Sequence, residues 1–377
     1  MRTVLISGAG IAGATLAWWL ARSGFVPTVV ERGGKTRSSG APVDVRGQAL
    51  EIVSAMELSD PLRQEATQVR EMVFLNSRGR EAARVDMALF AHGSEDIELP
   101  RGDLARILYE ASSSDAEYIF NDQIAVVEET PSGVDVCFES GAERHFDLLL
   151  GADGLHSRVR ELAFGPETAF TYHAGFYFAT MPLPDERPDP GKVLLYNCPG
   201  HAIAIHPARD QALCAFIFRH PQVPNFNPRD SSQHRLILKA AYANQSWRSG
   251  ELITKASASE DLYFDAVSQV TMDTWSRGHI ALVGDAASCL SLFGGGSSNA
   301  IIGAQILAKE LGAGQDHRTA FARYEQQHRP LVELGLRNFG RTSAQIVPKT
   351  LVGIAMRNFA VRLMPPAERI RRMMQRP

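Results

Sequence analysis

The chain has 377 residues, of which 45% are hydrophobic and 21% are charged, and its formal net charge is −3. This length suits two domains or one large α/β unit, and the composition is that of a globular protein. The weak acidic balance gives no reason to expect nucleic acid as a partner. The four cysteines form no C-x-x-C pair, so we expect neither a zinc site nor a dithiol centre. Scattered cysteines, no apolar stretch of bilayer length and no room for a signal peptide favour a cytoplasmic protein.

The first predicted elements form a β-α-β unit around a glycine-rich turn. Strands are predicted at Val4–Ser7 and Thr28–Val30, with a helix at Ile11–Arg22 between them. The turn has the pattern G-x-G-x-x-G, made by Gly8, Gly10 and Gly13. In such a unit the first glycine permits a tight turn, the second lets the backbone approach a pyrophosphate, and the third lets the helix pack on the strand. The helix N-terminus then offers free N–H groups to the anion.

Glu31 follows the second strand and indicates which dinucleotide is held. A carboxylate at this place accepts hydrogen bonds from the ribose hydroxyls of an adenosine. It would repel a 2′-phosphate, so the glycine turn predicts FAD or NAD, and not NADP.

The middle of the chain alternates between predicted helices and strands. A loop followed by a helix is predicted over Ala41–Leu58, a hairpin over Met72–Met87, and a helix over Pro100–Ser113 with Arg101 at its entry. Ile124–Gly154 predicts several strands that end in a buried apolar run.

The second half begins with a change in composition. Gly165 to about Leu262 holds many prolines and short β-like pieces, which predicts an inserted β-rich domain. A buried strand is predicted at His279–Ala287, and helical spacing resumes from about Ala300. The basic, partly amphipathic segment Val347–Pro377 predicts a helix across the domain surface; the alternative is contact with an anionic membrane.

Two further motifs decide between FAD and NAD. "GADGLHSRVR" starts at Gly151, and "GDAASCLSLFGGGSSNA" starts at Gly284. The second motif makes another anion-binding helix start, in which Asp285 can accept from hydroxyls such as those of a ribityl chain. The glycines at 294–296 let backbone N–H groups approach a flat ring. An NAD enzyme does not need this second site, whereas FAD does.

Together these motifs resemble the FAD-dependent aromatic hydroxylases typified by p-hydroxybenzoate hydroxylase. Within that class the chain looks most like the tetracycline-inactivating and polyketide-modifying monooxygenases, and the similarity covers about the whole chain. The resemblance implies an α/β fold: a three-layer, Rossmann-like FAD-binding domain with a parallel sheet, an inserted β-rich substrate domain and a C-terminal helix. The implied boundaries are 1–70, 100–165 and 265–345 for FAD binding, 71–99 and 166–264 for the substrate, and 346–377 for the helix and tail.

The resemblance also implies roles for individual residues. The ADP half of FAD would be held by Gly8, Gly10, Ile11, Ala12, Gly13, Glu31 and Arg32. Further FAD contacts are implied for Asp44, Arg46, Arg101, Asp153, Asp285, Gly295 and Ser298. Arg37, Asp153 and Arg160 would meet the nicotinamide cofactor, NADPH or NADH.

Several of these residues have a simpler alternative, and one loop departs from the family pattern. Asp44 and Arg46 could form a loop salt bridge, Arg101 could cover a helix end, Arg37 could be a solvated surface charge, and Asp153 and Arg160 could pair structurally. Leu292 stands where many family members have proline, and Ser297 stands where the last glycine is expected.

The substrate pocket is expected on the strands of the inserted domain. Its candidate aromatic walls, which could equally be core residues, are Phe176, Phe178, Tyr196 and Phe216. His201 and His206 are candidate bases for ionising a phenol. We find no metal motif.

The predicted function is that of an FAD-dependent, NAD(P)H-consuming monooxygenase. As the family implies, one oxygen atom from O₂ would enter an aromatic or polyketide-type molecule through a flavin C4a-hydroperoxide, in antibiotic biosynthesis or inactivation. The alternatives are a halogenase, whose W-x-W-x-I-P signature is missing, a prenyl-chain reductase, or a non-catalytic FAD-binding protein. Monomer and homodimer are both compatible with the sequence.

Overall fold

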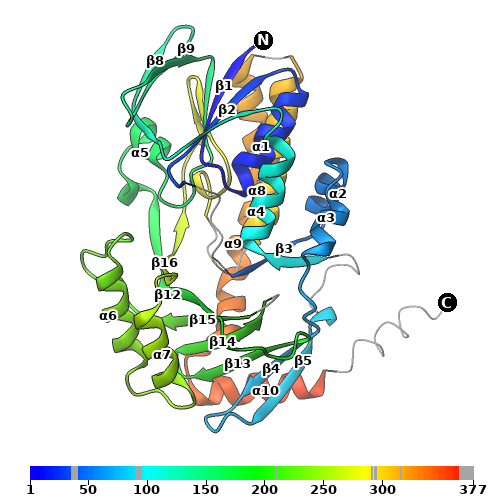
Figure 1. Ribbon diagram of the computed structural model, residues 1–377, viewed down its shortest axis with the longest axis vertical. Helices are drawn as coiled ribbons and strands as arrows, with labels where there is room; N and C mark the ends of the chain where they lie inside the picture. Colours follow the sequence, from blue (N-terminus) through cyan, green and yellow to red (C-terminus); the bar gives the residue numbers. More distant parts are fainter. Residues whose placement is uncertain are drawn as a thin grey trace, which may run out of the picture.

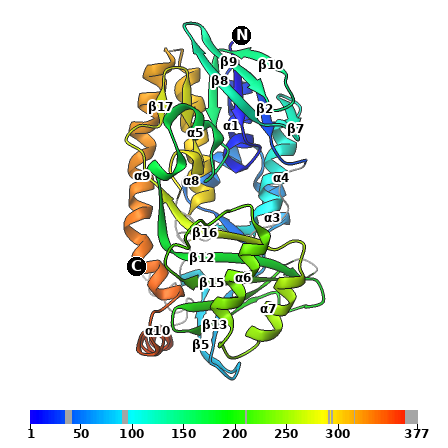
Figure 2. The same cartoon turned by 90° about the vertical axis from the view of Figure 1, so that its left-hand side faces the viewer.

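The computed structural model describes residues 1–34, 41–89, 96–208, 211–289, 292, 295–314 and 316–364. The molecule is elongated, with the N-terminus near one end of its long axis (Figure 1). A nucleotide-binding half occupies that end, and a large sheet occupies the other. Helix α9 (His317–Ile346) runs along the molecule from one half to the other (Figure 2).

A six-stranded sheet forms the centre of the nucleotide-binding half. Its order is β17-β18-β11-β1-β2-β7, and all its pairs are parallel except β17 with β18. The strands are β1 (Thr3–Ser7), β2 (Val26–Glu31), β7 (Glu117–Phe120), β11 (Leu148–Gly151), β17 (Ser276–Arg277) and β18 (Ile280–Leu282). β1, β11 and β18 are continuous apolar runs because both faces of a parallel sheet are covered.

Helices cover one face of this sheet and a small second sheet covers the other (Figure 1). The helices are α1 (Ile11–Arg22), α4 (Arg101–Ser112), α8 (Gly296–Gly312) and the first part of α9. The second sheet is antiparallel, with strands β8 (Ile124–Thr130), β9 (Gly133–Phe138) and β10 (Glu143–Phe146). The expected three-layer α/β fold with a parallel sheet is confirmed.

A two-stranded ribbon leaves the nucleotide-binding half. Strand β3 (Pro42–Val45) pairs antiparallel with β6 (Ile97–Pro100). Helices α2 (Gln48–Ala55) and α3 (Ser59–Gln64) follow β3. The sequence predicted a loop at β3, and this prediction is wrong. The segment becomes a strand only by pairing with β6, which lies far along the chain.

The seven-stranded sheet forms the other half of the molecule. Its order is β16-β12-β15-β14-β13-β4-β5, so the hairpin β4–β5 joins strands that come much later in the chain. The strands are β4 (Glu71–Leu75), β5 (Glu81–Asp86), β12 (Thr171–Leu183), β13 (Lys192–Cys198), β14 (His201–Pro207), β15 (Ala212–Arg219) and β16 (Tyr263–Val270). Helices α6 (Ser231–Tyr242) and α7 (Ser249–Ala258) cover one face. The domain boundaries given above stay a prediction.

The remaining elements join these parts. They are α5 (Arg158–Phe164), α10 (Leu351–Leu363) and the short 3₁₀ turns η1 (Met87–Leu89), η2 (Glu167–Ala169) and η3 (Gly284–Ala286). Helix α8 starts at Gly296, four residues before the predicted start. Within the described residues, none of the helices is long and apolar enough to cross a membrane.

Candidate functional site

The glycine loop between β1 and α1 is shaped by close backbone packing. Gly8 has φ +102°, and a Cβ there would lie 2.6 Å from the Ala152 carbonyl oxygen. A Cβ on Gly13 would lie 1.9 Å from the carbonyl oxygen of Gly8. Gly10 differs, because a Cβ there would meet no protein atom within 4 Å. Two glycines are therefore required by the fold itself, and the third leaves an open approach to the backbone.

No side chain accepts hydrogen bonds from the free N–H groups at the start of α1. Gly10 is the N-cap, no side chain caps the helix, and its first turn, which includes Ile11 and Ala12, has no acidic residue. Such a helix start attracts anions through its free N–H groups and its dipole. With the open side of Gly10, this arrangement fits a pyrophosphate.

The Glu31 carboxylate is held beside this loop by backbone donors. Its two oxygens accept hydrogen bonds from Ala9 N, at 3.0 Å, and from Gly33 N, at 2.8 Å. Each carboxylate oxygen can accept a further bond, so Glu31 can still bind ribose hydroxyls. Arg32 follows it and is exposed.

A second helix start of the same kind lies at α8. Its N-cap is Gly295, at φ +67°, and the helix has no side-chain cap and no acid in its first turn. A Cβ on Gly296 would lie 3.7 Å from Oδ1 of Asp285 in η3. Burial raises the pKa of Asp285, while Arg101 at the start of α4 and the Cys289 thiol act in the opposite direction. A partly buried carboxylate beside an uncapped helix start is suited to accept hydrogen bonds from hydroxyl groups next to a phosphate.

The ribbon strand β3 is hydrogen-bonded to the first turn of α8. The Asp44 carbonyl oxygen accepts from the hydroxyls of Ser297, at 2.7 Å, and Ser298, at 2.9 Å. Arg46 N donates to the Ser298 hydroxyl at 3.1 Å. The Asp44 carboxylate forms an ion pair with Arg46 at 2.8 Å, so the loop salt bridge that was the simpler alternative for these two residues is present. FAD contacts by this group stay a prediction.

The two departures from the family loop can be located. Leu292 has φ +73°, a value that proline, locked near −65°, cannot adopt. The backbone therefore differs from that of the proline-containing family members at this point. Ser297 uses its hydroxyl to bind β3, which a glycine could not do. Arg37 lies outside the described residues.

Asp153 and Arg160 have structural partners of their own. The Asp153 carboxylate accepts from the Ser157 hydroxyl and from the N–H groups of Arg158, at 2.8 Å, and Val159, at 3.0 Å, so it caps the start of α5. The Arg160 side chain is fully buried and donates to Leu155 and Ala286 carbonyl oxygens, at 2.5 and 3.0 Å.

These contacts change the expectations for both residues. A buried guanidinium with its own acceptors is not accessible to a transient nicotinamide cofactor, so that expectation for Arg160 is corrected. The structure describes no direct ion pair between Asp153 and Arg160 among its residues; the near carboxylate is Glu167, at 3.8 Å.

Two of the four aromatic residues expected to line the pocket lie on the far face of the seven-stranded sheet. The far face is the one that α6 and α7 cover. Tyr196 and Phe216 pack into the core beneath α6 and α7, where they are 1% and 0% exposed. The Tyr196 hydroxyl bonds the Ser246 hydroxyl at 2.8 Å, and Phe216 contacts Tyr242 edge to face. The expectation that they line the pocket is wrong, because side chains alternate between the faces of a strand.

The opposite face of the sheet, the near face, turns toward the glycine-rich loop before α8 and the C-terminal helices. Its cluster includes Leu292 and Phe339 of α9. Phe176 lies on this face but is covered by Phe339 and by Arg219, whose guanidinium carbon is 4.2 Å from the ring centre. Phe178 is only partly buried on the same face.

Small side chains form the middle of this face. Ala204 is paired with Ala215 on the neighbouring strand, and Ala202 follows one step along the same face. Ala202 and Ala215 are only 1% and 8% exposed, so other parts of the protein cover them, whereas Ala204 is only partly buried. These alanines were not predicted, although the alternation of Ala202 and Ala204 with Ile203 and Ile205, and of Ala215 with Phe216, is the signal that could have found them.

The two candidate histidines lie on opposite faces. His201 packs against Phe218 and Tyr242 in the core on the far face, so the expectation that it ionises a phenol is corrected. His206 lies on the near face, with Nε2 3.1 Å from Glu98 Oε1 and Nδ1 2.8 Å from the Pro207 carbonyl oxygen. Acceptors therefore lie at both ring nitrogens of His206, and its role as a base for a phenol stays a prediction.

The residues around His206 form a polar group on the ribbon. Burial acts to raise the pKa of Glu98, but hydrogen bonds from His206 and Thr67 lower it below its ordinary value. A cavity of about 440 Å³ opens beside Thr67, Asp96 and Glu98.

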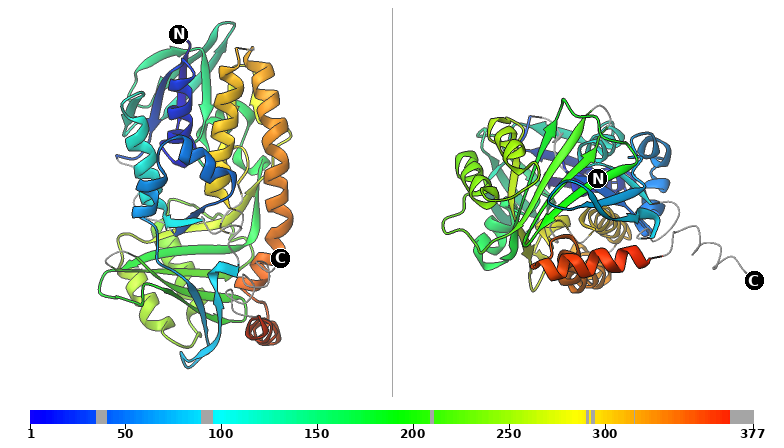
Figure 3. Two further views of the ribbon diagram at one scale, coloured as in Figure 1. Left: turned by 90° about the vertical axis from the view of Figure 1, so that its right-hand side faces the viewer. Right: turned by 90° about the horizontal axis from the view of Figure 1, so that it is seen from below.

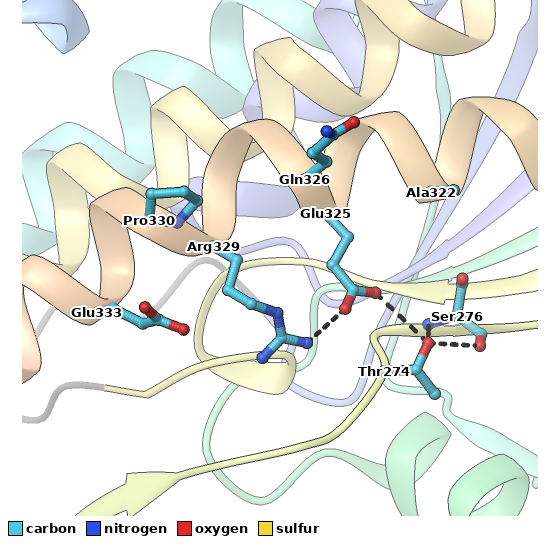
Figure 4. Close-up of a pocket in the computed structure, with 8 residues that line it drawn as sticks. All are labelled: Thr274, Ser276, Ala322, Glu325, Gln326, Arg329, Pro330 and Glu333. Atoms are coloured by element: carbon cyan, nitrogen blue, oxygen red, sulfur yellow. Dashed lines mark hydrogen bonds and ion pairs between the residues drawn. The ribbon is translucent and has the colours of Figure 1, made fainter.

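Another surface hollow, of about 390 Å³, lies on the outer side of α9 (Figure 4). Its charged groups bind one another: Arg329 pairs with Glu325, and Glu325 also accepts from Trp275 N at 2.8 Å. Arg329 further donates to the Met272 carbonyl oxygen at 3.0 Å. Because these contacts tie α9 to the loop between β16 and β17, we assign the hollow a structural role.

Comparison with known proteins identifies the family of this chain. A family model described as "FAD binding domain" matches residues 1–338. The chain belongs to the FAD-dependent monooxygenases of the aromatic hydroxylase type. It is 32% identical to a flavin-dependent monooxygenase of Legionella longbeachae, over 88% of this chain and 86% of that protein. It is 38% identical to the uncharacterized protein Rv1260 of Mycobacterium tuberculosis, over 88% of this chain and 91% of that protein.

A solved structure extends this similarity to the whole fold. The crystal structure of tetracycline destructase Tet(51) is 30% identical, covers 96% of each chain and superimposes with a TM-score of 0.85. The expectations of an FAD-dependent monooxygenase and of FAD as cofactor are thus confirmed. The two uncapped helix starts, the open side of Gly10 and the carboxylates of Glu31 and Asp285 fit FAD.

Proposed function

We propose that this monooxygenase consumes NADPH or NADH and inserts one oxygen atom from O₂ into a flat aromatic or polyketide-type molecule. The substrate would lie between the flavin ring and the near face of the seven-stranded sheet. Phe178 and Ala204 carry the proposal, because these partly buried apolar side chains lie on the face of the sheet against which Leu292 also packs.

In this proposal the chain's residues bind, orient and exclude water. The α1 start and Glu31 hold the ADP half of FAD, and the α8 start with Asp285 holds the riboside part. Bound FAD supplies the oxygen-activating chemistry, and the protein must keep water from it. Phe178 and Ala204 form apolar walls for the substrate, in keeping with the mainly apolar lining of small-molecule sites.

His206 serves as a hydrogen-bond anchor at the edge of this surface. It is joined to Glu98, and Glu98 to the Thr67 hydroxyl at 2.6 Å, so the group is rigid. This network connects the sheet to the ribbon that reaches α8. The relatives named as monooxygenases and the tetracycline destructase support a polycyclic substrate, and a cytoplasmic location stays a prediction.

The first test is anaerobic reduction of the bound flavin. Bleaching by NADPH and by NADH is followed with and without a panel of phenols and polycyclic polyketides, tetracyclines included. We expect at least one compound to accelerate bleaching about tenfold or more. The reason is that reducing the flavin before the substrate is bound would consume the nucleotide without oxygenating anything. Flavin that is never bleached by either nucleotide would overturn the proposal.

A matched pair of variants tests the position of the substrate. Ala204→Leu adds bulk to the near face and should abolish the acceleration while FAD stays bound. Ala240→Leu makes the same change on the exposed side of α6 and should leave the acceleration intact. If both variants show the same substrate-induced acceleration of flavin reduction, the substrate does not bind at this face.

A further inference from the structure

The ribbon β3–β6 has two unlike faces. The side chains of one face are apolar and pack against the core of the nucleotide-binding half; they are Val43, Val45, Ile97 and Leu99. Asp44 and Glu98 are paired across the two strands on the other face, because side chains alternate along each strand. The ribbon lies between the nucleotide-binding half and the seven-stranded sheet (Figure 1; Figure 3, left). It therefore belongs to the nucleotide-binding half and carries two carboxyl groups on its polar face.

Glu98 connects this polar face to the seven-stranded sheet. Its Oε1 accepts hydrogen bonds from His206 Nε2, at 3.1 Å, and from the Thr67 hydroxyl, at 2.6 Å. Thr67 N also donates to the Glu98 carbonyl oxygen, at 2.7 Å. Burial acts to raise the pKa of Glu98, but the bonds from His206 and Thr67 lower it. An ionised carboxylate of the ribbon therefore holds a ring that lies on the near face of the sheet.

The same ribbon reaches the residues that fit the riboside part of FAD. The Asp44 carbonyl oxygen accepts from the Ser297 and Ser298 hydroxyls in the first turn of α8. Strand β6 continues directly into α4, whose first residue is Arg101. Burial raises the pKa of Asp285, and the positive charge of Arg101 acts against this rise. Each strand of the ribbon thus leads to the site that Asp285 and the α8 start offer to FAD.

The contacts form one continuous path from the sheet to the cofactor site. Glu98 stands opposite Asp44 in the ribbon and only three residues before Arg101. Charge is felt along the same path, because burial raises the pKa of Asp44, Arg46 lowers it, and the Glu98 charge raises it further. A two-stranded ribbon has little stability of its own, so its position depends on the groups to which it is bonded.

We propose that Glu98 is a positioning residue, which couples FAD held at the α8 start to the near face of the sheet through its bond to His206. This inference rests on the proposed function, which places the substrate on that face. A molecule that contacts His206 would shift or fix Glu98, and the ribbon would carry this change to α8 and Asp285. Coupling of this kind is reciprocal, so bound FAD also favours the bonded arrangement of His206.

FAD release from the holoprotein tests the coupling without any substrate. His206→Ala and Glu98→Ala should each speed release, followed by the rise in flavin fluorescence, about threefold or more, because each variant loses the same charge-assisted bond. The double variant should release FAD no faster than Glu98→Ala, since one bond cannot be lost twice. Release that is unchanged in the single variants, or effects that add in the double variant, would overturn the proposal.

A conservative variant and a matched control separate positioning from general destabilisation. Glu98→Gln keeps an oxygen that can accept from His206 and Thr67, so it should restore slow release. Asp135→Ala breaks another carboxylate–histidine pair, with His145 at the exposed surface, and should release FAD as the parent protein does. A lower Tm with parental FAD release in Glu98→Ala, or equal release by Glu98→Gln and Glu98→Ala, would contradict a positioning role.

Flavin reduction tests the substrate side of the coupling. With the compound that most accelerates bleaching of the parent protein, Glu98→Ala should lose about fivefold or more of the acceleration. The concentration of that compound that half-saturates the effect should change less than the rate does. Equal acceleration in the parent and in Glu98→Ala would overturn the proposal. If no compound accelerates the parent, the proposed function fails, whereas FAD release still decides the coupling by Glu98, so the two failures are distinguishable.

Discussion

The glycine loop before α1 and the seven-stranded sheet both contribute to the site, but their residues are specified in different ways. In the loop, close backbone packing determines which residues are allowed, because any Cβ at Gly8 or Gly13 would overlap a carbonyl oxygen. In the sheet, the alternation of side chains along each strand determines which face a residue lies on. Phe216 lies under the helices, while its neighbour Ala215 pairs with Ala204 on the other face. A backbone requirement is visible in a short motif, whereas the face of a strand depends on register.

The largest effect is expected from the glycine loop, where two glycines can be separated. Gly13→Ala should prevent stable folding or FAD binding, because its Cβ would lie 1.9 Å from the Gly8 carbonyl oxygen. Gly10→Ala has free space around its Cβ in the protein, so it should fold but lose FAD affinity. Thermal unfolding and FAD titration measure the two effects.

A matched control is Gly250→Ala in α7, where a Cβ also has no neighbour within 4 Å and no ligand is expected. It should retain FAD and gain slight stability, since alanine favours helix over glycine by about 1 kcal/mol. If Gly10→Ala binds FAD as well as this control does, the glycine loop does not contact the pyrophosphate.

The two faces of the sheet are tested by a pair of phenylalanines. Phe216→Ala should lower the free energy of unfolding by about 3–5 kcal/mol, because it opens a cavity in the core under α6. Phe178→Ala should cost less than about 2 kcal/mol, since its side chain is only partly buried. Denaturant unfolding measures both costs.

Substrate dependence separates the same two variants. Phe178→Ala should change the substrate concentration that half-saturates flavin reduction, and Phe216→Ala should leave it unchanged in the folded fraction. The opposite result would place the substrate beneath α6 and α7, which would reverse the assignment of the faces.

The sequence predicted the nucleotide-binding half better than the sheet, for reasons visible in single residues. The β1–α1 unit is a local feature and is present as predicted, while ribose binding by Glu31 stays a prediction. Strand β3 was missed because its partner β6 follows some fifty residues later. Tyr196 was assigned to the wrong face because composition identifies a strand without giving its register.

Buried polar residues were the other source of error. Arg160 sits in a motif that resembles a cofactor contact, yet its guanidinium is bound by two carbonyl oxygens. The group formed by His156, Glu167 and Asp265 was missed entirely, because its members come from the turn before α5, from η2 and from β16, which meet only in the folded chain. No spacing in the sequence reports such a contact.

A smaller effect is expected where the two halves meet. His156, just after the Asp153 turn, contacts Glu167 at 3.0 Å and Asp265 of β16 at 3.3 Å. Burial alone would lower the pKa of His156, but the hydrogen bonds that its ring donates to these carboxylates raise it to about 9. The folded pKa lies above the ordinary value of 6.5, so the contribution to stability is complete below about pH 6.5 and is lost as the pH rises through about 9.

His156→Gln should therefore lower the Tm by about 2 °C at pH 6, and the difference from the parent protein should vanish above pH 9. His145→Gln is the control, because His145 is paired with Asp135 at the exposed surface, where such a pair contributes little. A Tm difference for His156→Gln that is the same at pH 6 and pH 9 would show that the imidazolium does not join the halves.

The smallest effect is expected at Ser297, where the cofactor loop departs from the family pattern. Ser297→Ala removes the hydroxyl bond to the Asp44 carbonyl oxygen and should cost about 1 kcal/mol, because the Ser298 hydroxyl still binds that oxygen. Ser297→Gly removes the same bond and also adds backbone freedom in the first turn of α8, for about 1 kcal/mol more. Comparing the two variants by unfolding and by the rate of flavin reduction separates these contributions. If the rate changes only with glycine, the backbone of this turn controls the flavin; if both variants change it equally, the bond to β3 does.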